Sequence, residues 1–497
     1  MNGKAFKAAL AATVFVSAAG AAHGQTSGQN ADAKIADLQR QVDELKALVR
    51  ALQMAQRGAE TPAPTLADAR TPAPAPVEQA AAELATATPP VGVSAPEDPR
   101  LAASSSMPEA APVPKKKAWH EKLMIRGYTQ MRMNEIVSGP KSAPAGISRL
   151  RSVQDSGINE NGNFSLRRAR LVVQGDISDR VSLYVQGDIA AAVSNQSGTE
   201  PRQHFFQMRD AYADVFLDKA KTLKVRVGQS KVPYGWENLQ SSSNRIPLDR
   251  TDAINAPVPG ERDLGVVLYY TPPAVQKIWD ELAEDGQKLF GNYGAFALAA
   301  YNGQGINRIE RNGGLMTVAM ATMPFRLDGI GLAGQVAEFG VTAMRNQFRP
   351  EVRTGGVSAA SFDDNHVNFH GMIYPAPFGI QAEWTFGTAP QWDSALGAIR
   401  SQRATGGYVM AMYRVPETPV GQIIPFARWQ KYRGGWKSAT NAPRLETDEY
   451  EAGVEWLPMK ELEIAVSYSN VTRNEADERR TGRAKGDVVR AQVQWNY

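Results

Sequence analysis

Hydrophobic and polar residues alternate with a period of two over much of the chain after Leu123. The run RVSLYVQGDI at 180–189 shows this alternation, and so does the run FSLRRARLVVQGD at 164–176. A period of two is typical of a β-strand with one apolar and one polar face. Because only Ile177, Ser178 and Asp179 separate the two runs, the sequence predicts a β-hairpin.

The polar face of this hairpin carries two arginines, Arg168 and Arg170. An unpaired charge is strongly penalised in a dry core, so this face must meet water. The edge of a soluble sandwich would also satisfy that condition. The number of such runs, and the lengths of the connections between them, therefore decide the fold.

Sixteen strand-like runs follow one another to the end of the sequence, which is an even number. They cover 123–136, 164–176, 180–190, 204–217, 222–230, 264–271, 293–301, 315–323, 331–342, 365–375, 378–387, 404–414, 422–432, 446–457, 461–471 and 487–497.

The connections between these runs alternate between long and short. Residues 177–179 and 376–377 are short connections, whereas 231–263 is the longest. The exception is 272–292, which stands where a short turn is expected and carries a candidate short helix at 275–289. Tight turns on one side and long loops on the other are the layout of transmembrane β-barrels.

Sixteen strands with one polar face each cannot all turn that face to a dry core, and in lipid every backbone edge must be satisfied. Closure into a barrel meets both conditions, and a barrel of this size leaves an aqueous channel. The sequence therefore predicts an all-β fold, a 16-stranded antiparallel transmembrane β-barrel over 118–497.

The residues before the barrel predict three further segments. Residues 1–24 indicate a signal peptide that is removed on export. Residues 25–57 carry apolar residues at coiled-coil spacing, which predicts either an oligomerising stalk or a single amphipathic helix. The Ala- and Pro-rich stretch 58–117 cannot bury enough apolar surface to fold, so it predicts a disordered linker.

Composition excludes several classes of function. The 55 Lys and Arg residues exceed the 51 Asp and Glu by only four, too small a balance to indicate nucleic acid as a partner. The chain has no cysteine, which excludes disulfides and thiolate metal sites. His366 and His370 share a predicted strand face but lie about 13 Å apart, too far to share a metal ion. We expect no enzyme activity, no cofactor and no metal site.

If the apolar faces contact lipid, the polar faces line the channel with basic residues. The predicted pore-lining and anion-binding residues are Arg126, Arg132, Arg168, Arg170, Arg180, Lys224 and Arg226. Rings of basic residues select anions, and arginine forks suit phosphate oxygens in particular. The alternative is that these cations pair with acidic residues on the same faces, Asp188, Asp210 and Asp214, and leave little selectivity.

The loop 231–263 is the candidate constriction, because it is too long to be a turn. Its basic residues are Lys231, Arg245, Arg250 and Arg262, which stand among a similar number of acidic residues. The alternative is an ordinary solvated loop on the surface.

Three pieces of the sequence resemble the phosphate-selective porins, the family of porins O and P. They are KVRVGQSKVPYGWENLQSS, GERDLGVVLYY and LAAYNGQGIN, and they occur in the family's order. The resemblance covers 119–497. It implies a sixteen-stranded, trimeric outer-membrane channel, which in some members selects phosphate through an arginine ladder and a lysine-lined constriction. Neither feature can be placed residue by residue here.

The predicted function is an outer-membrane porin for passive diffusion of small solutes, with anions such as phosphate as the expected class. Two alternatives stay open. One is a general diffusion porin with weak selectivity. The other is a structural tether, in which the barrel anchors a coiled coil that contacts the cell wall. The expected partners are outer-membrane lipid, small anionic solutes and two further copies of the chain in a homotrimer.

Overall fold

The computed structural model describes residues 119–150, 158, 162–191, 205–291, 293–416 and 418–497, together with Asp43, which is helical. The predicted signal peptide, linker and remaining coiled-coil residues lie outside these described residues.

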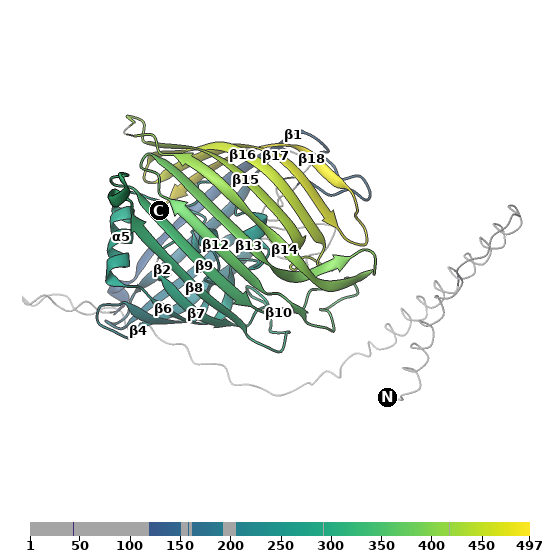
Figure 1. Cartoon of the computed structure of the whole chain (residues 1–497), viewed down its shortest axis with the longest axis horizontal. Coiled ribbons are helices and arrows are strands. Elements are labelled where there is room, and N and C mark those ends of the chain that lie inside the picture. The colour runs from purple at the N-terminus through teal and green to yellow at the C-terminus, as the bar shows by residue number, and fades with distance from the viewer. Residues whose placement is uncertain are drawn as a thin grey trace, which may run out of the picture. The chain divides into compact units, whose positions relative to one another are not determined.

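Sixteen strands of the described chain close into one antiparallel barrel (Figure 1). Each pairs with the next one along the chain, and β1 pairs with β18 to close the ring. They are β1 (Met124–Ser138), β2 (Asn163–Asp176), β3 (Val181–Ala191), β4 (Phe205–Phe216), β5 (Leu223–Lys231), β6 (Arg262–Tyr270), β7 (Phe296–Tyr301), β8 (Met316–Arg326), β9 (Val336–Arg345), β12 (His366–Ile373), β13 (Phe378–Asp393), β14 (Ala398–Tyr413), β15 (Gln422–Gly435), β16 (Arg444–Met459), β17 (Leu462–Ala476) and β18 (Arg483–Asn496). The predicted fold class is confirmed.

Side chains alternate between the two sides of the barrel wall. In β1, Gln130 and Arg132 are 0 % exposed, whereas Met131 between them is 39 % exposed. The exposed apolar side chains form the outer surface that contacts lipid, and the polar ones point inward. This alternation is what the period of two in the sequence predicts.

The short elements lie in the connections. A two-stranded ribbon of β10 (Gln347–Phe348) and β11 (Phe362–Asp363) separates β9 from β12. The 3-10 turns are η1 (Trp119–Lys122) and η2 (Asp328–Ile330), and the helices are α3 (Trp236–Leu239), α4 (Asp252–Asn255) and α5 (Pro273–Glu284). Figure 1 shows α5 and β10 at opposite ends of the barrel. Among the described residues, none of the helices is long and apolar enough to cross a lipid bilayer.

The predicted helix at 275–289 is shorter than expected. It corresponds to α5, which starts at a proline favourable for a first helical turn and ends before Gly286, whose φ of 75° breaks the helix. Val275, Trp279 and Leu282 form its buried face. The connection 272–292, the exception to the alternation, therefore carries a helix between β6 and β7, at the end of the barrel with the short turns.

Three predicted long connections are shorter than the sequence indicated. The predicted loop 388–403 is mostly a continuation of β13 and β14, which leave only 394–397 between them. The predicted loops 433–445 and 472–486 shrink to 436–443 and 477–482 for the same reason. Beyond the apolar band the outer face no longer contacts lipid, so the alternation that marks a strand fades although strand pairing continues.

Candidate functional site in the barrel lumen

The loop between β5 and β6 folds into the barrel. Nearly all of residues 232–261, the inward loop, are buried. The loop leaves the wall beside β5, yet Asp252 forms an ion pair of 2.7 Å with Arg473 in β17, and Asp249 forms one of 2.7 Å with Arg132 in β1. A segment that contacts several sides of a closed wall lies inside it, which fits the proposed constriction rather than a surface loop.

Helix α3 is held against the wall by a carboxylate. The two oxygens of Glu383 in β13 accept hydrogen bonds from the backbone N–H groups of Trp236, at 2.9 Å, and Glu237, at 3.0 Å. These are N–H groups at the start of the helix that have no partner within it. Gly235 precedes them with a φ of 70°, and a side chain there would collide with the Glu383 carboxylate. The glycine thus permits the docking.

Helix α4 is fastened in a similar way from three other strands. The Asp252 carboxylate accepts a hydrogen bond of 2.6 Å from the Thr447 hydroxyl in β16, besides its pair with Arg473. The Asp252 backbone N–H donates to Gln430 in β15 at 3.1 Å. The inward loop is therefore fixed on the far wall by side chains of four strands, β13, β15, β16 and β17.

Asp249 lies among four arginines of the described chain, which we call the Asp249 cluster. Its carboxylate is 2.7 Å from Arg132, 3.1 Å from Arg490, 3.5 Å from Arg167 and 3.7 Å from Arg168. Burial alone would raise the pKa of Asp249, but Arg132 and the neighbouring arginines hold it well below its usual range. Two predicted pore-lining residues, Arg132 and Arg168, thus fasten the inward loop to the wall.

A second cluster surrounds Glu261 at the end of the inward loop. We call it the Glu261 cluster. The Glu261 carboxylate is 3.1 Å from Arg250, 3.6 Å from Arg245, 3.7 Å from Lys231 and 3.9 Å from Arg209, and it also pairs with Arg262. All four predicted constriction cations therefore converge on one carboxylate. Burial would raise the pKa of Glu261, but Lys231 and Arg250 hold it well below its usual range.

The Glu261 cluster carries more positive than negative charge. Within the described part of the chain, five cations face Glu261 and one further carboxylate, Asp210, which pairs with Arg262 at 3.0 Å. The Nε atoms of Arg209 and Arg245 are buried and form no hydrogen bond with the described residues. A site with three more positive than negative charges, next to N–H groups that form no hydrogen bond with the described residues, is suited to holding an anion.

The remaining predicted strand cations are mostly neutralised. Arg170 pairs with Asp188 at 2.8 Å, and both Lys224 and Arg226 pair with Asp214, at 2.9 and 2.7 Å. These are the pairings that the alternative interpretation of the sequence expected. A continuous basic wall over the first strands is therefore not what the structure presents.

Arg126 and Arg180 lie at the short-turn rim. Both are exposed. Arg126 donates to Gln174 at 3.1 Å near the start of β1. Arg180 precedes β3 rather than lying within it, and its guanidinium donates to the Leu217 carbonyl at 3.0 Å in the next short turn. The prediction of Arg180 as a strand residue that lines the pore is corrected, because the hairpin turn extends through it.

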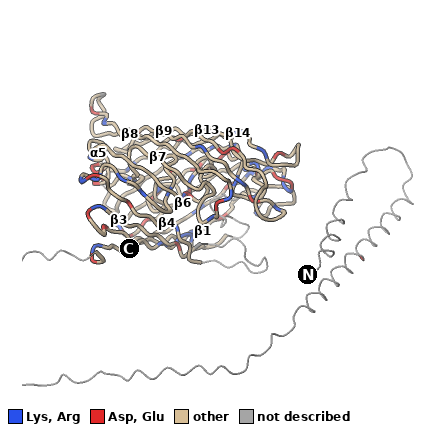
Figure 2. The backbone as a smooth tube through the Cα atoms, turned by 90° about the horizontal axis from the view of Figure 1, so that it is seen from below, with Lys and Arg blue, Asp and Glu red and all other residues tan. Residues whose placement is uncertain are grey.

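Arg167 and Arg209, which sequence reasoning missed, are the most accessible arginines of the two clusters. Their side chains are 21 % and 13 % exposed, whereas the other cationic side chains there are nearly sealed. Tyr184 and Tyr212 are also half-buried, and their rings stack at 5.1 Å. The inner faces of β2 to β4 therefore border the open part of the lumen. Figure 2 shows basic and acidic positions interspersed over the barrel.

Within the described ranges, no three His, Asp or Glu side chains come together in a way that could hold a metal ion.

Residues 145–497 match the family model described as Phosphate-selective porin O and P. The chain belongs to this family. The resemblance seen in the sequence is confirmed, and the protein is an outer-membrane channel rather than an enzyme.

Solved porins provide three further likenesses. The outer-membrane channel DcaP of Acinetobacter baumannii is 14 % identical, with 76 % of this chain and 97 % of that chain covered and a TM-score of 0.47. The trimer form of OmpT of Vibrio cholerae is 10 % identical, with 76 % and 99 % covered and a TM-score of 0.42. An anion-selective porin from Comamonas acidovorans is 9 % identical, with the same coverage and a TM-score of 0.41. No curated protein matches this porin.

Proposed function

We propose that this porin carries small anions, phosphate and related oxyanions among them, past the Glu261 cluster. The observation that supports the proposal is the excess of positive charge there, where Arg209 and Arg245 have unused Nε–H donors. Fixed cations in a narrow passage stabilise a permeating anion because screening by water is weak there. Arg167 and Arg209 are the residues that a solute meets, because their side chains border the open lumen.

A general diffusion porin with weak selectivity is the second candidate. The pairing of Arg170 with Asp188, and of Lys224 and Arg226 with Asp214, favours it. Paired charges present little net field to a passing ion. The two candidates differ in whether the Glu261 cluster alone is enough to select anions.

Reversal potential under a KCl gradient in planar bilayers, followed by titration with phosphate, tests the proposal. We expect a chloride-to-potassium permeability ratio above one and block of the current by phosphate. Arg209→Gln removes one accessible cation and should lower that ratio by about threefold, since a unit charge at roughly 6 Å, screened by about 0.1 M salt, shifts the energies of chloride and potassium in opposite directions by about 0.35 kcal/mol each. Arg180→Gln is the matched control, because Arg180 lies in a turn at the rim, and should leave the ratio unchanged.

Weak selectivity, no phosphate block and no difference between the two variants would establish the general diffusion porin instead. Assembly as a homotrimer, a cleaved signal peptide at 1–24 and contact with the cell wall through 25–57 stay predictions from the sequence.

A further inference from the structure

The segment between β6 and β7, residues 271–295, reaches across the short-turn end of the barrel. We call it the short-turn insertion. Gln287 donates to the Pro375 carbonyl at 2.8 Å, beside β12, and Asp285 pairs with Arg414 at 2.6 Å, beyond β14. Lys288 pairs with Glu455 in β16 and with Glu463 in β17, the latter at 3.3 Å. In the described barrel β16 lies seven strands from β7, almost on the opposite side.

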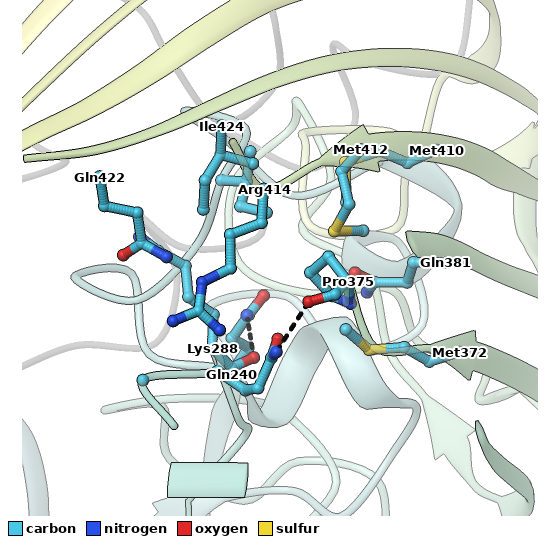
Figure 3. Close-up of a pocket in the computed structure, with 13 residues that line it drawn as sticks. Gln240, Lys288, Met372, Pro375, Gln381, Met410, Met412, Arg414, Gln422 and Ile424 are labelled. Carbon is cyan, nitrogen blue, oxygen red and sulfur yellow. Dashed lines mark hydrogen bonds between the residues drawn. The ribbon is translucent and has the colours of Figure 1, made fainter. Parts of the chain in front are cut away.

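This segment covers the short-turn ends of several strands. Residues 286–288 and the inner faces of β12 to β15 enclose a narrow pocket, and its wall includes Met372, Gln381, Met410 and Ile424. Figure 3 shows these side chains around Gln240, Lys288 and Pro375, and a dashed line ends at the Pro375 carbonyl. The lumen on the β12 to β15 side is therefore covered at this end.

The same segment supports the inward loop from the short-turn side. Gln240 donates to the Lys288 carbonyl at 3.1 Å, and Asn244 donates to the Leu289 carbonyl at 2.8 Å. The ring of Phe290 lies edge-on to Trp236 of the inward loop, at 5.9 Å, and to Trp279 of α5, at 5.3 Å. The two segments are thus packed as one unit inside the wall.

We propose that the short-turn insertion is a second barrier of the channel. Together with the inward loop it closes the lumen along β12 to β17, so that solutes cross only along β2 to β5. Lys288 is the residue that positions it, because its ammonium group joins the segment to two buried carboxylates of the opposite wall. The inference rests on the channel function of the family and not on anion selectivity.

The asymmetry of the contacts supports this role for Lys288. On the side of α5 the insertion has a buried apolar face of Val275, Trp279 and Leu282 in addition to its polar contacts with Glu338 and Arg326, whereas its contacts named above on the far side are ion pairs and hydrogen bonds. Loss of the lysine charge leaves Glu455 and Glu463 buried next to each other without their cation, which is strongly unfavourable. The far side is therefore where a single substitution releases the barrier.

Accessibility of single introduced thiols tests the proposal, and the chain provides a clean background because it has no cysteine. Gln381→Cys reports the covered side, and Tyr184→Cys on β3 reports the open side. Each is placed in the full chain and in a variant in which Asn-Gly replaces residues 271–295. That dipeptide forms a two-residue hairpin turn, and Tyr270 and Phe296 are already paired neighbours.

A neutral methanethiosulfonate reagent is added to each side of the bilayer in turn. We expect the thiol of Gln381→Cys to react about tenfold faster or more in the shortened variant, since a buried site reacts only when local opening exposes it. The thiol of Tyr184→Cys should react equally fast in both chains. Equal reaction rates for Gln381→Cys in the two chains would overturn the proposal.

Lys288→Met keeps the proposal testable where the shortened variant does not fold. This variant keeps most of the unbranched side chain but removes its charge, and it should speed the reaction of Gln381→Cys without affecting that of Tyr184→Cys. Heat-modifiable migration in gels shows that the barrel is folded. Because the reagent is uncharged, the outcome is independent of the Glu261 cluster, and a failure of anion selectivity in Arg209→Gln would leave it untouched.

Discussion

The Asp249 and Glu261 clusters look alike but differ in charge balance. In the first, Arg490 also pairs with Glu451 at 2.8 Å, and Glu451 in turn pairs with Arg428, so carboxylates and guanidinium groups alternate through a network. In the second, the described residues offer two carboxylates to five cations. Arginines in a barrel wall therefore indicate an anion site only where acids do not balance them. One cluster fastens the inward loop, and the other has charge to spare for a solute.

The largest effect is expected from Asp249→Asn, which removes the carboxylate shared by four arginines. Breaking a buried ion pair on one side leaves buried charge uncompensated, so the free energy of unfolding should fall by about 3 to 5 kcal/mol. Urea unfolding in detergent micelles, followed by tryptophan fluorescence, measures it. If Asp249 fastens the loop, single-channel current should also become noisier.

The matched control for this prediction is Asp176→Asn. Asp176 pairs with Lys221 at 2.8 Å, but both side chains are more than two-fifths exposed. An exposed pair contributes less than about 1 kcal/mol. Equal destabilisation by the two substitutions would show that Asp249 does not fasten the inward loop.

The strands could be predicted from the sequence. The direction of Arg167 and Arg209, the most accessible arginines of the two clusters, could not. Strict alternation places Arg167 and Arg209 on the lipid side. In the structure Gln130 pairs with Arg168 and Met131 with Leu166, so Arg167 is an extra residue in β2, and Arg209 is likewise extra in β4 between Met208 and Asp210. At a β-bulge the extra residue breaks the period of two, so its side chain does not point to the side of the wall that strict alternation predicts. No signal in the sequence marks these two bulges.

The charge balance of the lumen could not be predicted from the sequence either. The sequence predicted the basic residues of the loop 231–263 and its acidic ones, but pairing depends on which strands the loop reaches. Asp249 and Glu261 lie only twelve positions apart, yet the first contacts arginines of β1, β2 and β18 and the second contacts Arg209 of β4. Contacts across a closed barrel join residues far apart in the chain, which local pattern cannot reveal.

Glu261→Gln should have an intermediate effect, on selectivity rather than on stability alone. Removal of its charge increases the positive excess of the Glu261 cluster, so the chloride-to-potassium permeability ratio should rise by about threefold, the converse of the effect of Arg209→Gln. Reversal potentials under a KCl gradient measure it. An unchanged ratio would mean that the cluster does not face the conducting path.

Acidification provides a control for that substitution. The folded pKa of Glu261 is depressed, so its carboxylate keeps its charge as the pH falls below the usual range for glutamate. A bath at about pH 4, close to the ordinary pKa of glutamate, should therefore leave the permeability ratio of the unmodified porin near its neutral value. A threefold rise at that pH would contradict the close approach of Lys231 and Arg250.

The smallest effect is expected from Arg126→Gln, because Arg126 belongs to neither the Asp249 cluster nor the Glu261 cluster. Arg126 was predicted to line the pore, but it is exposed at the short-turn rim and bonded to Gln174. In 1 M KCl a charge in open solution is screened within about 3 Å, so the permeability ratio should stay within about a fifth of its original value. At about 0.1 M the screening length grows to roughly 10 Å, and a small decrease should become measurable. A decrease as large as that of Arg209→Gln at high salt would place the selective passage at the rim and not at Glu261.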